Sequence, residues 1–158
     1  MAHDRGGIRG RATAMLAAGL LLAGVAQVQA QTQADSALPP VQKSGAVQYL
    51  SGGIGLDEST AIKSASRHWP LSLVFSVQAA GKAEFASDVK LEIRDAKGAL
   101  VLDATASGPF LLARLAPGSY SLRATLAGKT LERKVQVKAG SSARVELVWP
   151  AGTNQGRP

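Results

Sequence analysis

Short stretches in which apolar and polar residues alternate recur between turn signals along residues 71–149. The clearest is YSLRATL at residues 120–126, where every second residue is apolar. Pro117 and Gly118 precede it and predict a type II turn with the glycine at its third position, and Gly128 follows it. A period of two is that of a β-strand with one face in a core. The chain is therefore restricted to folds assembled from short, mostly antiparallel strands.

The pattern predicts about seven such strands with turns between them, as in a sandwich or barrel. They are expected at residues 71–77, 89–94, 99–104, 110–115, 120–126, 130–137 and 143–149. Asp95-Ala96-Lys97-Gly98 predicts a turn that joins the second and third as a hairpin. Arg133 is in phase with apolar neighbours, which predicts a bulge or a sheet edge there. No second helix is long enough for a parallel crossover, so the predicted fold is mainly β and antiparallel.

One amphipathic helix is expected before the strands, at about residues 57–69. Asp57 is a good N-cap and Pro70 ends the element. The glycines of residues 52–55 come directly before it. Backbone N–H groups there could face an anion, but Asp57 would repel it, and a tight turn leading into the helix is the favoured interpretation.

The first thirty residues have the features of a secretory signal peptide. Arg5, Arg9 and Arg11 precede the apolar run MLAAGLLLAGVA, and small residues allow cleavage after Ala30. The run is shorter than the about 20 residues that span a bilayer, so an uncleaved anchor is the less favoured alternative. No cysteine follows it to carry a lipid. We expect an exported protein, periplasmic or secreted.

Composition divides the rest of the chain. Residues 31–44 and 151–158 are polar, contain proline or glycine and lack periodicity, which predicts a flexible leader and a disordered tail. Residues 45–150 then form one β-sandwich domain with its N-terminal helix. Removing thirty of the 158 residues leaves 128, with a net charge near +5 out of the whole chain's +7. That balance suits anionic partners but is also common without them.

Residue usage argues against most catalytic and metal chemistry. The chain has no cysteine, and His68 is the one histidine beyond the predicted cleavage site. Thiolate sites, zinc sites with several nitrogen or sulfur ligands and a Cys–His nucleophile are therefore excluded within the chain. A serine triad would need His68, and no G-x-S-x-G motif accompanies it. We interpret His68 as a surface or helix-cap residue, and predict no catalytic, cofactor-binding or metal-binding residue and no cofactor.

Charged residues leave two further possibilities open. A glycosidase-like pair could come from carboxylates, although most occupy turns or outward strand positions and none has calcium-loop spacing. These carboxylates are Asp57, Glu58, Glu84, Asp88, Glu92, Asp95, Asp103, Glu132 and Glu146. A basic stripe could come from Lys90, Arg94, Arg123, Lys134, Lys138 and Arg144. Glu92, Glu132 and Glu146 interrupt the stripe, and the chain has seven aromatic residues, so we predict no nucleic-acid binding.

Residues 110–122, FLLARLAPGSYSL, resemble the F-x-x-x-x-L-x-P-G-x-Y-x-L stretch of carboxypeptidase regulatory-like domains. Residues 88–91 and 95–98 suit the same layout, and the similarity spans roughly residues 71–149. The resemblance implies a transthyretin-like (prealbumin-like) sandwich of seven antiparallel strands in a Greek key, with no catalytic residue to transfer. The whole chain, with its G-G-x-G-x-x-E opening, also resembles exported proteobacterial proteins of unassigned function. A weaker similarity links the helix and residues 70–75 to the short N-terminal domains of secretins and TonB-type proteins.

Three functions remain as hypotheses. The leading one is an exported, non-enzymatic binding or accessory module that acts through protein or envelope-polymer contacts, docking at an exposed sheet edge. The second is a carboxylate-dependent hydrolase with a site in a loop cleft. The third is a structural subunit of a secretion or cell-surface assembly. We expect a protein or envelope partner, and no stable membrane span after cleavage.

Overall fold

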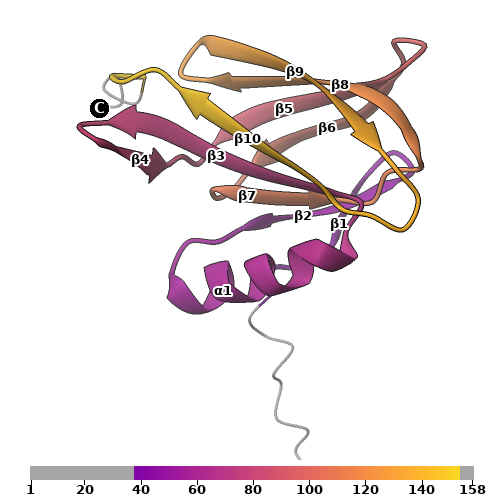
Figure 1. Ribbon diagram of the computed structural model, residues 1–158, viewed down its shortest axis with the longest axis horizontal. Helices are drawn as coiled ribbons and strands as arrows, with labels where there is room; N and C mark the ends of the chain where they lie inside the picture. Colours follow the sequence, from indigo (N-terminus) through magenta and orange to yellow (C-terminus); the bar gives the residue numbers. More distant parts are fainter. Residues whose placement is uncertain (1–37, 154–158) are drawn as a thin grey trace, which may run out of the picture. The chain divides into compact units, whose positions relative to one another are not determined.

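A computed structural model describes residues 38–153 (Figure 1). The predicted signal peptide, the first half of the predicted leader (residues 31–37) and residues 154–158 lie outside the described residues. The described residues form ten strands, one α-helix and one short 3-10 helix. In chain order they are β1 (Gln42–Ser44), β2 (Val47–Gly52), α1 (Leu56–Ala65), η2 (Ser66–His68), β3 (Leu71–Ala79), β4 (Lys82–Phe85), β5 (Val89–Asp95), β6 (Leu100–Ala106), β7 (Phe110–Ala113), β8 (Gly118–Leu126), β9 (Lys129–Val137) and β10 (Ala143–Trp149).

Two sheets face each other (Figure 1). Sheet A has the order β1-β2-β7-β3-β10, with β4 continuing beyond β7 along β3, and sheet B has the order β6-β5-β8-β9. The mainly β, sandwich-like fold is confirmed. The prediction of seven antiparallel strands is wrong, because β1, β2 and β4 add to the seven and because β10 runs parallel to β3.

The missed strands lack the signal that revealed the others. In β2, residues 49–52 are all buried, since one face meets sheet B and the other meets the helix. A strand covered on both faces shows no alternation of apolar and polar residues. β4 is exposed at all four positions and β1 has three residues. Residues 42–44, predicted as part of the leader, form β1 instead, in which Gln42 pairs with Tyr49 of β2.

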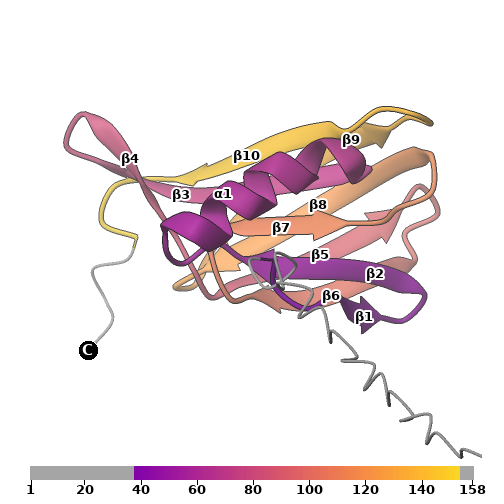
Figure 2. The same ribbon diagram turned by 90° about the horizontal axis from the view of Figure 1, so that it is seen from below.

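The fold has three layers, sheet B, sheet A and the helix, and an apolar core lies between each layer and the next. The larger lies between the sheets and contains the inward residues of β3, β5, β8 and β10, among them Phe75 and Trp149. The smaller lies between sheet A and the helix that crosses its outer face (Figure 2). It consists of Leu50, Ile62, Trp69, Val74, Phe110 and Leu112. The existence of the helix is thus confirmed, and its apolar side is what covers sheet A.

The helix boundaries differ from the prediction of about 57–69. The N-cap position is Gly55, whose φ of 99° favours glycine, and Asp57 lies in the first turn. The α-helix ends at Ala65, and a 3-10 turn follows before Trp69 adopts an extended backbone that lets its indole enter the second core. Gly53 also has a positive φ, and a Cβ there would overlap Phe110. Gly53 and Gly55 therefore allow the tight turn that leads into the helix, which is the interpretation that the sequence favoured.

The hairpin predicted at residues 95–98 is confirmed. The Asp95 carboxylate accepts the N–H groups of Lys97 and Ala99, each at 2.9 Å. The type II turn predicted at Pro117-Gly118 is wrong, because Gly118 has no positive φ and instead begins β8 opposite Val137. This corner is fastened by Tyr120, whose hydroxyl donates to the Ala116 carbonyl at 2.8 Å, the contact by which a tyrosine corner fixes a sandwich.

Tyr120 makes the stability of the fold depend on pH in the alkaline range. Burial, and to a smaller degree the Asp95 carboxylate, raises the pKa of the Tyr120 phenol above the ordinary value of about 10. The unfolded chain ionises first, so this contribution to stability is complete below pH ~10 and is lost as the pH rises through the folded-state value. Between about pH 9 and about pH 11, urea unfolding should show a steeper loss of stability for the wild type than for Tyr120→Phe. Parallel pH dependences would contradict this.

The β8–β9 turn contains a residue that is unfavourable for its backbone conformation. Leu126 pairs with Lys129, and the two residues between them, Ala127 and Gly128, have φ values of 46° and 78°. Positive φ at both positions defines a type I′ turn, which favours Asn-Gly and disfavours alanine. Ala127→Asn should raise the free energy of unfolding by about 0.5–1 kcal/mol. Ala96→Asn is the matched control, because Ala96 has no positive φ. An equal gain in both variants would refute the turn argument.

Candidate functional site

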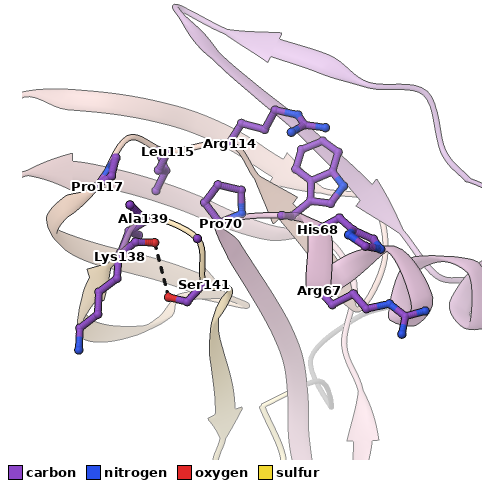
Figure 3. Close-up of a pocket in the computed structure, with 12 residues that line it drawn as sticks. Arg67, His68, Pro70, Arg114, Leu115, Pro117, Lys138, Ala139 and Ser141 are labelled. Carbon is purple, nitrogen blue, oxygen red and sulfur yellow. Dashed lines mark hydrogen bonds between the residues drawn. The ribbon is translucent and has the colours of Figure 1, made fainter.

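A hollow of about 410 Å³ opens at one end of the sandwich (Figure 3). Three segments far apart in sequence meet there: the η2–β3 junction, the link from β7 to β8 and the turn from β9 to β10. Pro70, Leu115 and Ala139 lie between the surrounding cationic side chains in Figure 3. The hollow therefore has an apolar middle and a basic rim.

The walls of the hollow are tied to one another. The Ser142 hydroxyl donates to the Ser66 carbonyl at 2.9 Å, and the Ala143 N–H donates to the Pro70 carbonyl at 2.9 Å. Within the β9–β10 turn, the Ser141 N–H donates to the Lys138 carbonyl at 3.4 Å. The first two bonds hold the β9–β10 turn against the start of η2 and against Pro70, so the backbone around the hollow is fixed before a ligand binds.

The ionisable side chains that line the hollow are all basic. Arg67, His68, Arg114 and Lys138 belong to this lining, and none of its twelve residues is Asp or Glu. The Arg114 guanidinium lies 4.3 Å from the centre of the Trp69 ring, a cation–π contact that holds it in place while leaving its N–H donors for a ligand. Arginine and lysine in such a place are donors for carboxylate, sulfate or phosphate oxygens.

His68 is exposed at the end of η2, as predicted. Its membership of a basic cluster was not predicted. Arg114 and Lys138 join it only because sheet A brings the ends of β3, β7 and β10 together. A run of basic residues in the sequence would have revealed such a cluster, and here the cations come from three separate segments.

The structure brings two of the candidate carboxylates together. Glu92 on β5 is the cross-strand partner of Asp103 on β6, and both line an open hollow of about 510 Å³ on the outer face of sheet B. Arg94 contacts Glu92 at 3.5 Å. The remaining carboxylates are spread over the helix start, β4, the turns, β9 and β10. Within residues 38–153 no group of three Asp, Glu or His side chains is placed to hold a metal ion.

The predicted basic stripe divides between surfaces. Lys90, Arg94, Arg123 and Lys134 alternate with inward residues on β5, β8 and β9 and so share the outer face of sheet B. Arg144 lies on β10 of the other sheet and pairs with Glu146 at 3.3 Å. Arg123 pairs with Glu132 at 3.5 Å. Lys138 belongs to the basic hollow instead.

The sheet edges, the predicted docking surface, differ in how they are covered. On β6, the Ser44 hydroxyl donates to the Asp103 carbonyl at 3.1 Å and accepts the Asp103 N–H at 3.0 Å. On β9, Arg133 donates to the Glu132 carbonyl at 2.9 Å. The prediction that Arg133 marks a sheet edge is confirmed, and the register shows no bulge there. Charged side chains of this kind discourage strand addition.

Comparisons with known proteins leave the family open. No family model matches the chain, and no curated protein matches it. Three chains of solved structures match, one of them described as "Crystal Structure of S.CueP". That match has a TM-score of 0.36 and 13% identity and covers 70% of this chain and 76% of the other, which is too weak to carry an argument. The resemblance to carboxypeptidase regulatory-like domains stays a prediction. Among the described residues, no helix is long and apolar enough to cross a membrane.

Proposed function

We propose that this chain is an exported, non-enzymatic binding module that captures an anionic group of an envelope polymer or protein partner in its basic hollow. The observation that supports the proposal is the lining of that hollow, with four basic residues and no carboxylate. Its apolar middle favours a ligand whose anionic group is attached to an apolar or flat portion. Export rests on the signal-like N-terminus.

Binding at the hollow requires no reaction chemistry. Guanidinium and ammonium groups held on a fixed rim donate charge-assisted hydrogen bonds, which are roughly twice as strong as neutral ones. The hydrogen bonds of Ser142 to Ser66 and of Ala143 to Pro70 fix the backbone segments that carry the rim residues. A preorganised site loses less conformational entropy on binding than a flexible one. The hollow is therefore suited to recognition of an anion on a larger partner.

The test is an NMR titration of the purified protein with inorganic phosphate and with citrate. We expect amide shifts at residues 67–69 and 138–141 that weaken as salt is added, because exposed charges are screened. The double variant Arg67→Glu, Lys138→Glu should bind at least about tenfold more weakly. Its matched control is Lys90→Glu, Lys134→Glu, which makes the same charge change on the outer face of sheet B. Equal weakening by both would show attraction to net charge alone and contradict the proposal.

Partner identity calls for affinity capture from cross-linked envelope extract, read by mass spectrometry. The wild type should retain a protein or polymer that the Arg67→Glu, Lys138→Glu variant loses and the sheet B control keeps. Capture of the same material by all three proteins would count against the hollow as the binding surface. Thermal unfolding of each variant verifies that the fold is intact.

A further inference from the structure

Three edge strands of sheet A, β1, β4 and β10, have no side chain of the described residues hydrogen-bonded to their backbone, and β10, with seven residues, is the longest of them. Within the described residues, no side chain hydrogen-bonds to the backbone of residues 143–149, whereas Ser44 covers part of β6 and Arg133 part of β9. Figure 2 shows β10 along one margin of sheet A. The Arg144 and Glu146 side chains are 55% and 60% exposed, and Val148 is 38% exposed. The strand is open to solvent along most of its length.

The direction of the free backbone groups follows from one hydrogen bond. The Ala143 N–H donates to Pro70 next to β3, so the backbone of Ala143 faces β3. Backbone groups point to alternate sides along a strand. Arg144, Glu146 and Val148 therefore direct their N–H and C=O groups away from β3, toward the open margin. A second strand laid there would find three residues ready to pair.

We propose that β10 pairs antiparallel with β10 of a second copy of this chain, which joins two copies of sheet A into one continuous sheet. The charge pattern selects this occupant. In a two-fold pairing centred on Val145, Arg144 of each copy lies opposite Glu146 of the other. Both residues expose their backbone groups on the pairing side, so each Arg–Glu couple is also a hydrogen-bonded pair. Opposite charges across a strand pair stabilise it and like charges destabilise it.

Neighbouring registers are less favourable. In a register shifted by one residue, each residue with outward backbone groups would lie opposite a partner residue whose backbone groups face β3. The outward groups would then have no partner for a hydrogen bond. A shift by two would bring Arg144 opposite Arg144, or Glu146 opposite Glu146. The Arg-x-Glu spacing on β10 is therefore complementary to itself in one antiparallel register.

The experiment is sedimentation velocity over a concentration series up to about 1 mM, where a dimer even of millimolar affinity is visible. The wild type should dimerise. Arg144→Glu and Glu146→Arg should each weaken the dimer at least about tenfold, because each replaces two attractive pairs by two repulsive ones. An equimolar mixture of the two variants should form a heterodimer, since one copy then offers two acids and the other two bases. The double variant should regain wild-type association.

Glu92→Arg is the matched control, because Glu92 and Arg94 form the same two-residue ion pair on β5, an inner strand of sheet B. It should leave dimerisation unchanged. Glu146→Pro removes one outward N–H without touching the bonds to β3, and should also weaken the dimer. Three outcomes would overturn the proposal: a monomer at every concentration, a dimer that neither reversal affects, or a mixture of the two variants that stays monomeric.

Discussion

Replacing Trp149 with alanine is expected to lower the free energy of unfolding by about 3–5 kcal/mol. The indole is fully buried at the end of β10, and its ring centre lies 6.3 Å from that of Phe75, with the planes tilted by 51°. Its Nε1–H donates to the Lys129 carbonyl at 2.9 Å, which fastens sheet A to the first residue of β9. Alanine would leave a cavity between the sheets and an acceptor without its donor. Urea unfolding followed by circular dichroism measures the loss.

Trp149→Phe separates the two contributions. Phenylalanine keeps an aromatic ring beside Phe75 and loses the donor to Lys129, so it should cost about 1–2 kcal/mol. A loss below about 1 kcal/mol for Trp149→Ala would mean that the end of β10 can collapse into the space, and that it is not a fixed part of the core.

Replacing Gly108 with alanine is expected to cost about 2–3 kcal/mol or more. A Cβ at Gly108 would overlap the carbonyl group of Gly52 and lie 2.9 Å from its Cα. The backbone there cannot easily move aside, because Gly52 pairs with Phe110 and the two neighbouring serines bind each other. The Ser107 N–H donates to the Ser51 hydroxyl, and the Ser107 hydroxyl donates to the Ser51 carbonyl, both at 3.0 Å.

Gly118→Ala is the control for this second substitution. Gly118 has no positive φ, and the nearest atom to its added Cβ would be a Tyr120 ring carbon at 3.7 Å, an ordinary contact. Its cost should stay below about 1 kcal/mol. Comparable losses in the two variants would show that the close approach of residues 52 and 108 is not what Gly108 serves. Thermal unfolding at one pH suffices for the comparison.

Sheet B could be predicted strand by strand, whereas in sheet A β3, β7 and β10 were predicted and β1, β2 and β4 were not. β5, β8 and β6 have one face in the core and one in water, so the pattern of Leu91, Ile93 and Leu122 among polar residues identifies them. β3, buried at its first seven positions, was predicted from its β-rich apolar run, whereas β2, buried at its last four, was not predicted. Burial on both sides removes the polar half of the pattern, and β2 then resembles an irregular stretch before a helix.

The basic hollow could not be predicted from the sequence, for a different reason. His68, Arg114 and Lys138 are ordinary surface residues within their own segments, and only the pairing of β3 with both β7 and β10 makes them neighbours. The carboxylates, in contrast, were correctly expected on turns and outward strand positions, because their alternation with lysine and arginine is local. Predicting contacts between distant segments requires knowing which strands pair, and the periodicity of the sequence does not give that information.

The parallel pairing of β3 with β10 also determines when the fold can be completed. Sheet B consists of two hairpins, β5–β6 and β8–β9, joined by the β5–β8 pairing. In sheet A, β2 must wait for β7, and β3 must wait for β10, which ends at Trp149. Pairings between residues so far apart form slowly, because the long loops between them must close first. A chain that emerges from its N-terminus can therefore assemble sheet B while β3 is still unpaired along one side, and the last strand to appear is the one that completes the core.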